Sequence, residues 1–431
     1  MENKSSNKPA EEVREEAGNS GSGRHAHGHV HKSRPFRRLR HFYRHNKKIF
    51  RIVGVLFLIV LLAVSAAVVV NKLSGNGEEE DANHNPSEAY VEAVVEIIPI
   101  EGPQNLIGPA AMKLLEEENY SSRAHAMMRF WNTGERLDVP APVELQFRIT
   151  VPVGWAVSSI RVLISEDPEL TKGRLIDVSP TKRSVTVYNL KADTEYFYRV
   201  TVVFVNEEQT EGTGSFKTAD TPRLLNIEGI VDVRDIGNRA TSSGRKIGQG
   251  ILFRGMELDA AAQKQNRITE KGIYDLLTVL GVRTDMDMRS PEVDPGFDAL
   301  GANVTHKYYD ILPYKDVFSA YGKSRIKLVF EDLADPDIYP VYLHCSAGTD
   351  RTGTICCLLE ALLGVNKEDL FTDYELTLLS RRSLQAEAFA EMVDMLEEYE
   401  GETLQQKTEN YLLECGLTHE QLESIRSIFL G

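Results

Sequence analysis

The chain has 431 residues, of which 42% are hydrophobic and 26% are charged, a composition that supports sizeable cores in two or three domains. Its net charge of −15 is uneven, because residues 1–51 hold 13 Lys+Arg and 5 Asp+Glu, a net +8 that leaves −23 for the remainder. A basic N-terminal segment followed by an acidic remainder is typical of a protein oriented across a membrane. This charge pattern argues against nucleic acid as a partner. All four cysteines lie in the last ninety residues or so, which excludes a disulfide framework.

Residues 1–51 are polar and then basic, with no apolar periodicity, which predicts a disordered tail. Four alternating histidines, His25, His27, His29 and His31, raise metal binding as an alternative role for this tail. Neither carboxylates nor cysteines stand beside them, so the pattern favours a solvated tail.

Residues 52–70 carry no charge, and as a helix of about 1.5 Å per residue they would span a hydrocarbon core of about 30 Å. Seven Lys and Arg residues precede them within fifteen positions, whereas an acidic run follows at 78–81. The positive-inside rule therefore predicts a single-pass cell-membrane protein with residues 1–51 in the cytoplasm and the C-terminal domains extracellular. A cleaved signal peptide is the alternative, but the fifty-residue leader and the long apolar core favour an uncleaved signal anchor.

Residues 71–90 form a Gly-, Asn- and Glu-rich linker, and residues 91–221 show short strand patterns separated by turns, which predicts an all-β sandwich. Period-two alternation indicates strands over 143–150, 158–164, 184–188 and 196–205. The stretch 112–134 departs from this pattern, which leaves the start of the sandwich open.

One part of the sandwich, residues 190–200, resembles the fibronectin type III signature, in which a tyrosine corner opens a strand. The resemblance implies that Tyr196 or Tyr198 is structural and not catalytic. The sandwich is then a candidate binding module for a protein or polysaccharide partner.

Residues 224–431 alternate between strand and helix patterns, which predicts an α/β domain with a central sheet flanked by helices. A helical pattern covers 269–280, a strand ends over 285–292, and a helical tail covers 367–430. The whole chain thus combines an α/β domain, a β-sandwich and one N-terminal transmembrane helix.

The most informative stretch runs from His344 to Gly353, between an apolar run over 338–343 that predicts a buried strand and an apolar pattern over 355–363 that predicts a helix. Backbone N–H groups of a turn at a helix N-terminus point inward and, together with the helix dipole, form an anion site. Arg351 can close such a site with a bidentate grip on phosphate oxygens. A thiol in the same field, here Cys345, loses its proton more easily than a free cysteine and becomes a nucleophile. A buried structural cysteine is the alternative, and the strand and helix context argues against it.

This loop resembles the signature of cysteine-dependent tyrosine and dual-specificity phosphatases. The order of further motifs, around Arg234-Asp235-Ile236-Gly237, Arg254 and Asp287-Met288-Arg289-Ser290, resembles the bacterial tyrosine- and lipid-phosphatase family over about residues 224–430. The resemblance implies that Cys345 attacks phosphorus to form a phosphocysteine and that Arg351 binds the equatorial oxygens. It further implies that Thr352 assists hydrolysis and that His344 helps to set the thiolate.

The same resemblance implies a set of substrate-binding residues: Ser346, Ala347, Gly348, Thr349, Arg234, Asp235 and Arg254. Several family members carry Lys at the position of Thr349, where its charge suits doubly phosphorylated or inositide substrates. The absence of that Lys weakens an inositide assignment without removing it.

Two aspartates compete for the role of general acid, which must protonate the leaving oxygen. Asp350 lies inside the loop and resembles the loop aspartate of the family, whereas Asp310 lies on a segment that can overhang the site. The sequence favours Asp350, with orientation of Arg351 as its alternative role. No metal cluster occurs in this domain, and the expected reaction needs no cofactor.

The sequence therefore predicts a membrane-anchored phosphatase for phosphate monoesters, with phosphorylated tyrosine in proteins as the favoured substrate. A phosphoinositide or inositol-phosphate phosphatase is the alternative with the same chemistry. A non-catalytic surface adhesion or phospho-ligand-binding protein is the alternative of another class, and the intact Cys345, Arg351 and Thr352 argue against it. Cys356 and Cys357 follow on the helix, where we expect them to be buried.

Overall fold

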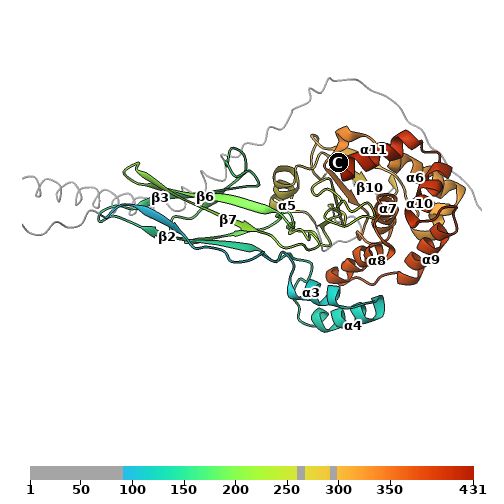
Figure 1. Cartoon of the computed structure of the whole chain (residues 1–431), viewed down its shortest axis with the longest axis horizontal. Helices are drawn as coiled ribbons and strands as arrows, with labels where there is room; N and C mark the ends of the chain where they lie inside the picture. The colour runs from blue at the N-terminus through green and yellow to red at the C-terminus, as the bar shows by residue number, and fades with distance from the viewer. Residues whose placement is uncertain (1–90, 260–266, 292–298) are drawn as a thin grey trace, which may run out of the picture. The chain divides into compact units, whose positions relative to one another are not determined.

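A computed structural model describes residues 91–259, 267–291 and 299–431. The predicted tail (1–51), membrane span (52–70) and linker (71–90) lie outside these residues. Among the helices that the structure describes, none combines the length and the apolar character that a membrane span requires. The described part contains two antiparallel sheets followed by an α/β domain (Figure 1).

The N-terminal region consists of a three-stranded sheet, β1-β2-β5, and a four-stranded sheet, β4-β3-β6-β7. The strands are β1 (Val94–Ile97), β2 (Val143–Thr150), β3 (Val157–Ser165), β4 (Arg174–Val178), β5 (Ser184–Val187), β6 (Glu195–Phe204) and β7 (Gln209–Lys217). Buried and more exposed residues alternate along β2 and β6, and Phe147, Val162 and Val200 from the two sheets meet in one apolar core. Of the seven strands, β2, β3, β5 and β6 lie where the alternation predicts strands, whereas β1, β4 and β7 are additional.

Tyr196, the second residue of β6, ties the strand to the loop before it. Its hydroxyl accepts a hydrogen bond from the backbone N–H of Lys191 at 2.8 Å, and its ring stacks on Phe216 with the centroids 5.6 Å apart. This bond is the one that defines a tyrosine corner. Tyr198 instead points into the core, where it is 1% exposed. The fibronectin type III assignment itself stays a prediction.

Two helices, α3 (Pro109–Glu116) and α4 (Tyr120–Trp131), interrupt the sandwich between β1 and β2, which corrects the all-β expectation for residues 91–221. Their apolar side chains, Leu114 and Met127 among them, are buried in the larger core of the α/β domain and not in the sandwich. A search for strand alternation misses such a segment, because its apolar face is matched to a different domain. We call these two helices the helical insert.

The α/β domain is built on a five-stranded sheet with the order β11-β10-β12-β9-β8. The strands are β8 (Arg234–Asp235), β9 (Leu252–Gly255), β10 (Thr284–Asp287), β11 (Thr305–Tyr308) and β12 (Val341–His344). All pairs are parallel except β8 with β9. The register sets Gly255, Asp287 and Tyr308 level with His344, so the carboxyl ends of four strands meet at one edge. In open parallel sheets this edge is where ligands bind.

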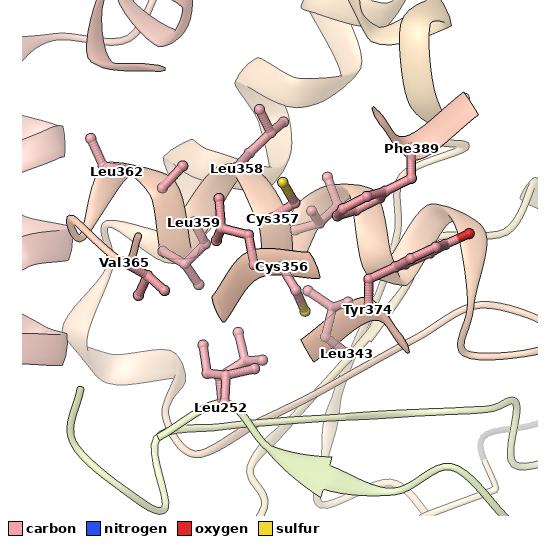
Figure 2. Packing of buried hydrophobic residues seen from close by; sticks show 14 of the residues in the cluster. Leu252, Leu343, Cys356, Cys357, Leu358, Leu359, Leu362, Val365, Tyr374 and Phe389 are labelled. Carbon is pink, nitrogen blue, oxygen red and sulfur yellow. The ribbon is translucent and has the colours of Figure 1, made fainter. Parts of the chain in front are cut away.

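Helices cover both faces of this sheet. The elements are α5 (Glu270–Tyr274), the π-helix η1 (Asp275–Val279), η3 (Tyr314–Phe318), α6 (Ala320–Leu333), η4 (Pro336–Ile338), α7 (Asp350–Leu362), α8 (Lys367–Glu375), η5 (Leu376–Ser380), α9 (Ala386–Glu397), α10 (Leu404–Glu414) and α11 (His419–Leu430). Leu252 and Leu343 face the larger core around α7, and Phe253 and Tyr342 face the smaller core beside α5 and η1. Figure 2 shows Cys356 of α7 above Leu343 and Leu252, inside the larger core.

Candidate active site

Cys345 directly follows the last residue of β12, and a short loop carries the chain to α7, which begins at Asp350. The loop bends at Gly348, whose φ of +78° favours glycine. A Cβ at Gly348 would lie 2.7 Å from the carbonyl group of Gly255. The close approach of these two backbones seats the loop at the carboxyl edge of the sheet. Cys345 at its base is 3% exposed.

The backbone N–H groups from Ser346 to Thr352 donate no hydrogen bond within the described part of the chain. Successive free N–H groups in a turn at a helix N-terminus form a concavity that binds anions. Arg351 is half-buried beside them, and among the described residues its guanidinium makes neither an ion pair nor a hydrogen bond. The loop thus presents N–H donors that no described group accepts from, and a phosphate site requires such donors.

The predicted substrate-binding role of Arg254 is corrected by its position underneath the loop. Its side chain is 1% exposed, and Nη2 donates to the carbonyl of Gly348 at 2.9 Å while Nη1 binds Asp373 of α8. Asp373 also accepts from Arg234 and Arg239. Burial opposes ionisation of Asp373, but the three guanidinium groups outweigh it and hold the pKa of this carboxyl well below its usual range. Arg254 therefore supports the loop from below.

Arg234 and Asp235 are likewise buried supports, at 1% exposure each, which corrects the expectation that they bind substrate. Arg234 binds Asp232 at 2.7 Å and Asp373 at 3.0 Å. Asp373 is also the partner of Arg254, which supports the loop. Asp235 accepts from Arg223 at 2.6 Å. Arg223 in turn donates to the carbonyl of Leu190 in the sandwich at 2.9 Å. Arg234 thus helps to support the loop, whereas the adjacent Asp235 helps to hold the contact with the sandwich.

His344 lies behind the nucleophile position with its ring 1% exposed. Its Nε2 is 3.0 Å from Oδ1 of Asp285 on β10, although the two atoms are not aligned for a hydrogen bond. Burial disfavours the charged ring, but attraction to Asp285 and Asp287 outweighs burial and raises the pKa of His344 to about 9. The motif analysis missed Asp285, and its only signal is the alternation of Asp and Met along β10.

Asp350, the favoured general acid, is half-buried at the first turn of α7. The hydroxyl of Tyr314 donates to its carboxylate, and that hydroxyl also lies 2.7 Å from the hydroxyl of Tyr374. Burial and the bond to Asp350 raise the pKa of Tyr314 far above its usual range, so it stays a donor. No sequence motif points to this pair of tyrosines, because the two residues are sixty positions apart.

Asp310, the competing acid, follows β11 at the same edge of the sheet. Its backbone N–H donates to the carbonyl of Arg289 at 3.2 Å, which keeps it beside the end of β10. Its carboxylate accepts from Tyr321 of α6 at 2.7 Å. The site edge therefore carries two aspartates, each fixed by its own tyrosine.

The remaining loop residues divide by burial. Ser346 and Ala347 are half-buried, whereas Thr349 and Thr352 are 2% and 0% exposed. The hydroxyl oxygens of these two threonines have no hydrogen-bond partner among the described residues. Thr349 thus presents no cationic side chain to a substrate.

A buried charged cluster that motif analysis did not assemble lies next to the loop. Arg289 is 1% exposed and binds Asp287, Glu257 and Asp259 with nitrogen–oxygen distances of 2.6, 2.9 and 2.8 Å. The backbone N–H of Glu257 also donates to the carbonyl of Ser346 at 3.4 Å. The cluster joins the ends of β9 and β10 to the loop.

The other cysteines lie away from this chemistry. Cys356 and Cys357 are buried on α7, as expected, and burial raises the pKa of Cys356 to about 12. Cys415 is also buried. A thiol with so high a pKa is a poor nucleophile, so Cys356 is not an alternative to Cys345.

Residues 225–431 match the family model described as "Tyrosine phosphatase family". Among solved structures, the chain is similar to the core catalytic domain of the PP-IP phosphatase SIW14 from S. cerevisiae in complex with citrate. The identity is 14%, the match covers 38% of this chain and 84% of that chain, and the TM-score is 0.24. No curated protein matches the chain. The family match covers the region that holds the five-stranded sheet and the Cys345 loop.

Proposed function

We propose that the protein hydrolyses phosphate monoesters through a phosphocysteine intermediate, with phosphotyrosine in proteins as the preferred substrate. The observation that carries this proposal is a set of backbone N–H groups from Ser346 to Thr352, with the guanidinium of Arg351 beside them, none of which has a partner among the described residues. These groups suit the three equatorial oxygens of a phosphoryl group, on which charge is spread in the transition state.

In the first step, the thiolate of Cys345 donates an electron pair to phosphorus, so that the S–P bond forms while the P–O bond to the leaving group breaks. Arg351 holds two equatorial oxygens with its planar fork. Asp350 in its protonated form transfers its proton to the leaving oxygen, which departs as a neutral phenol.

In the second step, a water molecule attacks phosphorus, so that a P–O bond forms while the S–P bond breaks and the thiolate is regenerated. Asp350, now a carboxylate, accepts the proton of this water. We assign the free, buried hydroxyl of Thr352 to donate to the departing sulfur. One ester and one water give one alcohol and one inorganic phosphate.

The test is hydrolysis of an aryl phosphate without added metal, by the full chain and by two variants. Cys345→Ser replaces the thiolate with a hydroxyl that does not ionise in this field, so turnover should vanish while phosphate binding persists. Arg351→Lys should be severely impaired, because an ammonium group lacks the planar fork. Cys415→Ser is the matched control, because this cysteine is buried at the C-terminal cap of α10. Appreciable turnover by Cys345→Ser would exclude the phosphocysteine.

The preference for phosphotyrosine over inositides is supported by Thr349, which is 2% exposed and adds no charge for a second phosphate. A panel of phosphotyrosine peptides, phosphoserine peptides, phosphoinositides and inositol phosphates should show the highest kcat/KM for phosphotyrosine. A higher value for an inositide would reverse this assignment. Binding without hydrolysis of any ester would favour the non-catalytic adhesion role.

We also propose that residues 52–70 anchor the chain in the cell membrane, with the C-terminal domains outside. The uncharged stretch and the basic residues before it support this orientation. Protease added to intact cells should then remove the phosphatase domain, and degradation only after lysis would show the opposite orientation. The sandwich is a candidate contact for an extracellular protein or polysaccharide.

A further inference from the structure

One buried carboxylate behind the loop contacts two imidazole rings. Asp285 of β10 is 1% exposed, its Oδ1 is 3.0 Å from Nε2 of His344, and its Oδ2 is 3.0 Å from Nδ1 of His306. β10 lies between β11 and β12, so three adjacent strands supply the three side chains. The His306 side chain, 18% exposed, is the outermost of them.

The second nitrogen of His344 faces the nucleophile's own backbone. Nδ1 lies 3.3 Å from the carbonyl oxygen of Cys345. A neutral imidazole has one N–H and serves only one of two acceptors, whereas an imidazolium offers an N–H to both. A carbonyl lies at Nδ1, and a carboxylate oxygen lies 3.0 Å from Nε2, close enough for charge attraction although not aligned for a hydrogen bond, so the surroundings suit the charged ring.

The groups around His344 also favour its charge. On β10 it faces Asp285 and, at 3.9 Å, Asp287, and beyond them lies the cation of Arg289. On its own strand the ring of Tyr342 lies 5.6 Å away, with its hydroxyl donated to the carbonyl of Met256. Together the carboxylates outweigh burial and keep the pKa of His344 at about 9.

His306 competes for the same carboxylate. Burial lowers the pKa of His306, but the contact with Asp285 outweighs burial, so the pKa is raised above its ordinary value. The charge of His344 opposes this rise. Two imidazole rings therefore compete for the one carboxylate of Asp285. Their mutual repulsion makes the protonation of each depend on the other.

We propose that Asp285 is a positioning residue for the nucleophile, because it holds the His344 imidazolium against the backbone of Cys345. His306 contacts the same carboxylate and thereby weakens the attraction between Asp285 and His344. The buried cation then lies against the carbonyl of Cys345 and holds the first peptide of the loop in place. The inference rests on the proposed function only in taking Cys345 as the nucleophile.

Two variants of the full chain test this with opposite expected signs. Asp285→Asn removes the carboxylate charge, so His344 should lose its proton near or below the free value of about 6.5. His306→Gln keeps a donor for Asp285 but removes a competing charge, so His344 should hold its proton to higher pH than in the wild type. Imidazole NMR titration measures both, and Asp275→Asn is the control, a buried carboxylate that binds Lys271 far from the loop sequence.

Alkylation of Cys345 by iodoacetamide gives a second readout that requires no hydrolysis. Its pH profile should move to higher pH in Asp285→Asn, with a rate about tenfold lower at pH 6, the equivalent of about one pH unit. His306→Gln should show no such move, and Cys345→Ser reports any background from other thiols. Because neither readout depends on turnover, a protein that hydrolyses no ester but shows these shifts would refute the proposed function alone.

An Asp285→Asn variant that folds but leaves the His344 titration and the alkylation profile unchanged would overturn the inference. Equal downward shifts in Asp285→Asn and His306→Gln would do the same, since they would indicate a general loss of structure. If Asp285→Asn does not fold, His306→Gln decides, and an unchanged titration of His344 in that variant overturns the proposal.

Discussion

The hydroxyl of Tyr314 donates a hydrogen bond to the carboxylate of Asp350. At the same edge of the sheet, the hydroxyl of Tyr321 donates to the carboxylate of Asp310 at 2.7 Å. The two candidate acids therefore present matched pairs, in which either the carboxylate or its tyrosine donor can be changed alone. Because the two pairs are of the same kind, four single variants can show which aspartate is the general acid.

Asp350→Asn should slow hydrolysis of phenyl or tyrosyl phosphate by about 100-fold, within the usual contribution of a general acid, and an activated nitrophenyl ester much less. A good leaving group departs without a proton, so the loss must depend on the ester. The ratio of kcat values for the two esters is the measurement. Asp310→Asn should leave that ratio unchanged. If Asp310→Asn alone changes it, the two roles are exchanged.

Tyr314→Phe removes the donor to Asp350 and keeps the ring. We expect kcat for poor leaving groups to fall by about tenfold, because one hydrogen bond to a charged group contributes about 1.5 kcal/mol or more. Tyr321→Phe is the control and should change kcat little. A larger effect from Tyr321→Phe would point to Asp310.

Gly348→Ala should abolish activity and destabilise the domain, because its Cβ would lie 2.7 Å from the carbonyl group of Gly255. Gly301 has a similar φ of +86° but open space around it, so Gly301→Ala tests backbone strain alone. That control should cost about 1 kcal/mol in unfolding free energy and leave kcat intact. Active Gly348→Ala protein would show that the loop tolerates displacement from β9.

Glu360→Gln should flatten the dependence of stability on pH. Glu360 is buried on α7, and burial together with the nearby charge of Asp373 raises its pKa to about 8 from 4.5. Its stabilising contribution is therefore complete below about pH 4.5 and is lost as the pH rises through 8. Relative to wild type, the variant should gain at least about 1.4 kcal/mol between pH 5 and pH 8.5, the equivalent of one pKa unit. Urea unfolding at several pH values measures this difference, and parallel curves would contradict it.

The helical insert is joined to α8 by a buried ion pair between Arg123 and Glu375, with nitrogen and oxygen 2.8 Å apart. Arg123→Met leaves a buried carboxylate without its partner and should cost about 3–5 kcal/mol in urea unfolding. Adding Glu375→Gln should recover part of that loss. The exposed pair of Arg148 and Glu96 is the control, where Arg148→Met should cost less than about 1 kcal/mol. Equal costs for both single variants would show that burial does not matter here.

The strand, loop and helix around Cys345 could be predicted because their signals are local: an apolar run, a glycine turn and an apolar helix within a few residues of one another. The role of Arg254 could not, because its partner Asp373 lies 119 positions away and only the fold brings them together. For the same reason the motif alone predicts that Arg234 and Asp235 bind substrate, although in the fold their partners are internal.

The helical insert stands out in the sequence only as a break in the strand pattern over 112–134, for a different physical reason. It is threaded into a region of strand alternation, yet its apolar residues belong to the core of the next domain. Asp285 was missed because an acidic residue alternating with methionine on a strand is typical of a solvated face. Here that face is covered, and the carboxylate finds its partners on neighbouring strands.

The hydrogen bond from the indole of Trp131 to the carbonyl of Leu378, at 3.0 Å, joins the insert to the segment that follows Asp373. A gene fusion that exchanges the sandwich at residue 221 would therefore remove a piece of the catalytic domain along with it. Recombination that preserves the enzyme has to keep residues 109–131 with the phosphatase, although they are encoded inside its neighbour. The stretch of sequence that has to stay together is therefore longer than the domain that the motifs outline.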